Sequence, residues 1–84
     1  MHPAIWIPYL IEFLKTDTRV KQSLLREFGI IDTVILIVRR KSWDHPEICY
    51  NLLYDVCKGN IRNKKKICES IDLILNEPNK FYSQ

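Results

Sequence analysis

Residues 30–40, IIDTVILIVRR, form an apolar run whose hydrophobic side chains would lie on every side of a helix. A run of this kind is typical of a helix buried between two others or of a buried strand. Its β-branched isoleucines and valines keep the strand alternative open. If this run is helical, the whole chain is predicted to be all-α, because the segments on both sides of it show helical periodicity.

The residues before the run predict two helices. The first spans Pro3 to Lys15, and the second, shorter one spans Arg19 to Phe28. Thr16-Asp17-Thr18 separates them and offers an N-cap, while Gly29 stands where a left-handed C-terminal cap is common. Their apolar positions, spaced by three and four residues, are Ile5, Trp6, Tyr9, Leu10, Phe13 and Leu14 in the first helix and Val20, Leu24, Leu25 and Phe28 in the second.

The residues after the run predict up to three more helices. Asp44 can cap a helix that begins at Pro46 and ends at Gly59-Asn60, and a short basic helix should follow over Ile61 to Glu69. Ser70 can cap a last helix, which Pro78 would stop. The buried stripe of the helix from Pro46 is predicted at Cys49, Leu52, Leu53, Val56 and Cys57, and the apolar positions of the last helix are Ile71, Leu73, Ile74 and Leu75.

A weak internal repeat suggests how these helices are arranged. The segment LLREFGIIDTVIL (24–36) is similar to KICESIDLIL (66–75), at an offset of about 40 residues. Such a period belongs to the armadillo and HEAT helical repeats. The predicted fold is therefore an all-α, armadillo-like right-handed superhelix fragment of about two repeats and five to six helices. We expect it to occupy residues 1–76, with a polar tail over 77–84.

The chain resembles the armadillo-like superhelical proteins over nearly its whole length. Within that class, RVKQSLLREFGIIDTVI followed by PEICYNLLYDVCKGNIRNKKKICES is similar to the RIH domain of inositol trisphosphate and ryanodine receptors. The resemblance implies an interaction module first and an anion site second. By position it implicates Arg19, Arg26 and Arg62 as phosphate ligands, whereas another basic position of the family is Ser23 here. The β-trefoil that completes the family's ligand site has no counterpart in these residues.

A basic cluster near the C-terminus has several interpretations. Its five cations, Lys58, Arg62, Lys64, Lys65 and Lys66, fall within nine residues without an intervening acid. They indicate a solvated basic turn, a site for a phosphate-bearing partner or a site for an acidic protein surface. The net charge of only +3 and the lack of a recognised motif make nucleic acid a weaker prediction.

No catalytic pattern is recognisable. His2 and His45 are expected to be exposed polar residues, and the chain contains neither a Gly-rich phosphate loop nor a His-Glu-x-x-His pattern. The three cysteines lack the spacing of a disulfide framework or a zinc site, which indicates reduced thiols in a cytoplasmic protein. The hydrophobic runs are too short to span a bilayer. We therefore predict a cytoplasmic non-enzyme without a cofactor, a metal site or a membrane span.

The aromatic residues predict a docking surface. A stack of only about two repeats leaves one apolar face uncovered, and Trp6, Tyr9 and Phe13 would lie on it. Trp43, in a polar loop, is a further candidate. The predicted function is a protein-binding or assembly module that docks a partner or a second copy of itself. The alternatives are a small regulator that binds inositol phosphate or nucleic acid through the basic residues, and a structural helical dimer.

Overall fold

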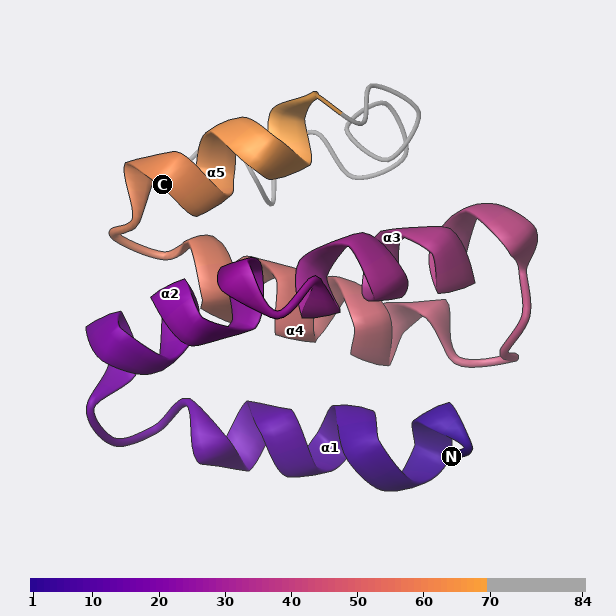
Figure 1. Ribbon diagram of the computed structural model, residues 1–84. Coiled ribbons are helices and arrows are strands. Elements are labelled where there is room, and N and C mark those ends of the chain that lie inside the picture. Colours follow the sequence, from indigo (N-terminus) through magenta and orange to yellow (C-terminus); the bar gives the residue numbers. More distant parts are fainter. Residues whose placement is uncertain (70–84) are drawn as a thin grey trace.

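Figure 1 shows the computed structural model of the chain, which describes residues 1–69. The prediction of an all-α chain is confirmed, since no strand occurs within this range. The apolar run from Ile30 to Arg40, for which the sequence allowed either a helix or a strand, is a helix. The five helices are α1 (Pro3–Phe13), α2 (Thr18–Glu27), α3 (Ile30–Arg40), α4 (Pro46–Cys57) and α5 (Ile61–Cys68).

Local signals at both ends explain why α3 is helical despite its β-branched content. Gly29 precedes it with φ of 76°, a left-handed conformation that costs glycine little. Asp32 in the first turn and Arg39 and Arg40 in the last turn have the charges that the helix dipole favours. The buried side chains, Ile31, Val34 and Ile35, follow helical spacing. Burial of one face therefore outweighs the intrinsic β preference.

Helix α4 lies at the centre of the fold. It contacts all four other helices, with α1 along one side of it and α5 along the other (Figure 1). Every residue of its predicted stripe is buried, and Leu53 is fully enclosed. Burying a leucine of this kind contributes about 1.5–3 kcal/mol. The predicted buried stripe of α4 is thus confirmed, and Tyr50 joins it.

The helix caps differ in part from prediction. Proline occupies the first turn of both α1 and α4, as expected from its fixed φ. The N-cap of α4 is His45, so the prediction that Asp44 caps this helix is wrong. The ring of His45 lies 3.2 Å from the carboxylate of Glu47 and makes no capping bond to the backbone. Asp17 is the N-cap of α2, but its left-handed backbone (φ of 48°) leaves its side chain without a capping bond.

Several predictions lie outside the described residues. They are the last helix from Ser70 through Leu75, its stop at Pro78 and the tail over 77–84. The second copy of the internal repeat, residues 66–75, is only partly described, because it begins in α5 and continues past residue 69. The five helices of residues 1–69 fit the predicted number. The armadillo-like arrangement of two repeats stays a prediction.

Candidate anion-binding site

A hollow of about 350 Å³ lies between α2 and the start of α5. Helix α2 contributes Arg19, Ser23 and Arg26, which share one face because they are four and three residues apart. The turn into α5 supplies the other side, at Gly59, Asn60, Ile61 and Arg62. The three arginines that the family resemblance implicated therefore meet at one place. Ser23, the position where this chain departs from the family, lies among them.

The positive charge of this hollow has no carboxylate against it in residues 1–69. None of the ion pairs found there involves Arg19, Arg26 or Arg62. Helix α5 also begins at this place, so the partial positive charge of its first amide groups adds to that of the guanidinium groups. Arginine forks and a helix N-terminus are the donors that bind phosphate oxygens in proteins.

Gly59 shapes the turn that brings the two sides together. Its φ of 68° lies in the left-handed region, which any residue with a β-carbon adopts at a cost. A β-carbon here would stand 3.7 Å from Nη2 of Arg19, an ordinary contact distance. Glycine is therefore required by the backbone conformation of the turn, and the guanidinium of Arg19 lies close against that turn.

A buried network of amide side chains supports the hollow from beneath. Arg26 donates from Nη1 to Oδ1 of Asn63 at 2.9 Å, and Asn63 is itself fully buried. The amide of Asn63 donates to the backbone carbonyls of Gln22 (3.0 Å) and Val56 (2.7 Å). The Arg26 guanidinium is thus fixed to the interior of the fold, which reduces the entropy that it would lose on binding a ligand.

The same network caps the C-terminal end of α4. Gln22 from α2 donates to the carbonyls of Asp55 and Lys58, both at 2.9 Å, and Asn63 from α5 donates to that of Val56. Asn60 donates to the Gln22 side-chain oxygen at 3.3 Å and accepts from the backbone N–H of Asn63 at 3.0 Å. Helix ends carry carbonyls without intrahelical partners, and here side chains from two other helices bind them.

The predicted cluster of lysines does not converge on the hollow. Lys66 forms an ion pair with Asp32 of α3 at 3.2 Å, and Lys65 is exposed. Lys58 lines a different depression, between α1 and the end of α4. Lys64 lines a smaller neighbouring hollow that shares Gly59, Asn60 and Ile61 with the arginine site. Only Arg62 of the five clustered cations lines the hollow with Arg19 and Arg26.

The residues predicted for protein docking have mixed exposure. Trp6 and Phe13 of α1 are half-buried and pack against the core, as does Trp43. Tyr9 is 66% exposed and stacks on Phe13 with ring centroids 6.2 Å apart. An exposed apolar stripe that the prediction did not include lies on α2, at Val20, Leu24 and Phe28. The sequence pattern identified these residues as apolar positions at helical spacing but did not predict that they are exposed.

A search of family models, curated proteins and solved structures finds no match for this chain. The resemblance to the RIH domain is therefore neither supported nor opposed by a relative. Among residues 1–69 no helix is long and apolar enough to cross a membrane. The same residues contain no group of three or more metal-binding side chains.

Proposed function

We propose that the protein is a non-catalytic binding module whose hollow between α2 and α5 takes a phosphate-bearing ligand. The observation that supports this most directly is the convergence of Arg19, Arg26 and Arg62 on one hollow at a helix N-terminus. None of the three takes part in an ion pair found within residues 1–69. Each guanidinium presents two parallel donors that match the geometry of phosphate oxygens.

A calorimetric titration of the protein with inositol trisphosphate tests this proposal. We expect Arg19→Gln and Arg62→Gln each to weaken binding about tenfold, since each removes a charge-assisted hydrogen bond. Affinity should also fall steeply between low and physiological salt. The matched control is Arg40→Gln, an exposed arginine at the far end of α3. An equal loss of affinity in all three variants, or an affinity that does not change with salt concentration, would contradict a specific site.

A second candidate function is self-association of the kind expected for an armadillo-like assembly module. It is favoured by the apolar stripe of α2, where Val20 is 64% exposed, Leu24 37% and Phe28 76%. These residues lie four apart, so they form a continuous line along one side of the helix. Lines of exposed apolar side chains mark contact surfaces more often than isolated ones do. A second copy that covers this line would remove it from water.

Light scattering on the full chain tests self-association. We expect a mass above that of the 10.1 kDa monomer at micromolar concentration, and Leu24→Ser with Phe28→Ser should return the protein to a monomer with unchanged helicity. Tyr9→Ser is the matched control, because Tyr9 is also an exposed apolar residue, at 66%, but lies on α1. A wild-type monomer, or dissociation caused equally by Tyr9→Ser, would rule out the α2 stripe as the contact.

A further inference from the structure

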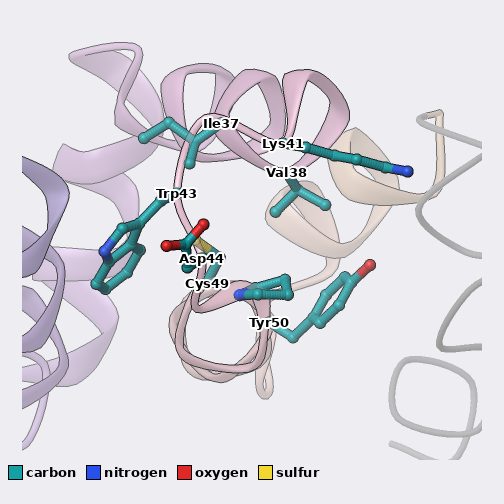
Figure 2. A pocket seen from close by; sticks show the side chains of 8 residues that line it. Ile37, Val38, Lys41, Trp43, Asp44, Cys49 and Tyr50 are labelled. Carbon is teal, nitrogen blue, oxygen red and sulfur yellow. The ribbon is translucent and has the colours of Figure 1, made fainter.

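A second hollow, of about 360 Å³, lies where α3 ends and α4 begins, away from the arginine site. Figure 2 shows the side chains around it. Its volume is at the lower end of the range of small-molecule sites, which run from about 300 to 1,000 Å³. The hollow therefore suits a ligand of about the size of an amino acid. Its eight lining residues are Ile37, Val38, Lys41, Trp43, Asp44, Pro46, Cys49 and Tyr50.

The walls of this hollow are mostly apolar. Ile37 and Val38 come from the last turns of α3, and Pro46 and Tyr50 from the first turns of α4. Trp43 lies at one side of it (Figure 2). Cys49 is fully buried at its base, and burial, with a smaller contribution from Glu47, raises the pKa of this thiol from 9.0 to about 11. The base is therefore a neutral thiol at physiological pH, which suits an apolar group.

Two opposite charges line the same hollow without pairing. Lys41 and Asp44 are both exposed, and no ion pair joins them to each other or to another residue of 1–69. Figure 2 places the Asp44 carboxylate on the side of Trp43, and the Lys41 ammonium on the opposite side, where the hydroxyl of Tyr50 also lies. The backbone of Lys41 is left-handed, with φ of 52°, a conformation that is uncommon outside glycine and asparagine. The connection from α3 to α4 thus presents one anion and one cation across an apolar hollow.

We propose that this hollow binds a small zwitterion with an apolar body, of the class of the aromatic and branched-chain α-amino acids. The ligand ammonium would pair with Asp44, its carboxylate with Lys41, and its side chain would enter between Val38, Trp43 and Tyr50. A ligand with only one charge could pair with only one of Asp44 and Lys41, whereas a zwitterion can pair with both. This site is independent of the proposed phosphate site, because the two hollows have no lining residue in common.

Nuclear magnetic resonance on the ¹⁵N-labelled full chain tests the proposal. The probes are L-phenylalanine, phenethylamine, which lacks the carboxylate, and 3-phenylpropanoate, which lacks the ammonium. The Trp43 indole N–H reports on the hollow, and the Ser23 amide reports on binding at the arginine site. We expect phenylalanine to shift Trp43 and leave Ser23 unchanged, with an affinity about tenfold above that of either analogue.

Two variants separate the charges. Asp44→Asn and Lys41→Met should each weaken phenylalanine binding about tenfold, while Glu47→Gln, an exposed carboxylate two residues from His45, should not change it. Far-ultraviolet circular dichroism confirms that each variant keeps its helices. Equal affinity for the three probes, unchanged binding in both variants, or shifts at Ser23 instead of Trp43 would overturn the proposal.

Discussion

Replacing Asn63 with leucine is expected to lower the free energy of unfolding by about 3 kcal/mol or more. Asn63 is fully buried, and its side chain donates to two backbone carbonyls and accepts from Arg26. Leucine has nearly the same shape but makes none of these bonds, and each buried group left without a partner costs about 1–3 kcal/mol. Urea unfolding followed by circular dichroism measures the change.

The matched control is Asn51→Leu. Asn51 is an exposed residue of α4, so the same replacement there should change stability by no more than about 0.5 kcal/mol. If both variants unfold at the wild-type urea concentration, the amide network does not stabilise the fold. If both lose the same stability, the loss comes from adding an apolar side chain and not from breaking the network.

Replacing Ile7 with alanine is also expected to have a large effect, and should lower the free energy of unfolding by about 2–4 kcal/mol. Ile7 is the buried residue at the middle of α1, where that helix packs on α4, and it is fully enclosed. Removing three carbon atoms there leaves a cavity that the surrounding helices fill only partly. Chemical denaturation of the monomeric protein at low concentration measures the loss.

Tyr9→Ala provides the comparison for Ile7→Ala on the same helix. Tyr9 is two residues away and 66% exposed, so its truncation should cost about 1 kcal/mol or less. The reverse order, with Tyr9→Ala more damaging than Ile7→Ala, would show that α1 packs through the aromatic face.

Helix α1 shows how far periodicity alone can be taken. The pattern correctly predicted a helix from Pro3, but the apolar positions it selected omitted Ile7, the most buried residue of that helix. Apolar side chains occur around most of α1, so several overlapping stripes fit the spacing rule equally well. Which stripe faces the core depends on where α4 lies, and that information is not local to residues 3–13.

The arginine site was predictable only in part. The resemblance to the RIH domain pointed to Arg19, Arg26 and Arg62, and all three line the hollow. The run of basic residues in the sequence pointed to lysines, which do not line this hollow. Gln22 and Asn63 were missed entirely, since amide residues on a polar helix usually face water. Gln22 donates to carbonyls at the end of α4, 33 and 36 residues away in sequence, and Asn63 donates to the Gln22 carbonyl of α2, 41 residues away. No short-range pattern carries that relation.

The anchoring of Arg26 to the interior has a thermodynamic consequence. Asn63 joins that guanidinium to the carbonyl end of α4, so a ligand that binds Arg26 is connected to the bonds that must break when the chain unfolds. Occupancy would also raise the melting temperature by mass action on the native state, because the stabilisation grows with the logarithm of ligand concentration once the site is largely filled. A thermal shift screen of anions could therefore report on this hollow without a label, and the Asn63→Leu protein would give a smaller response because its Arg26 is no longer held.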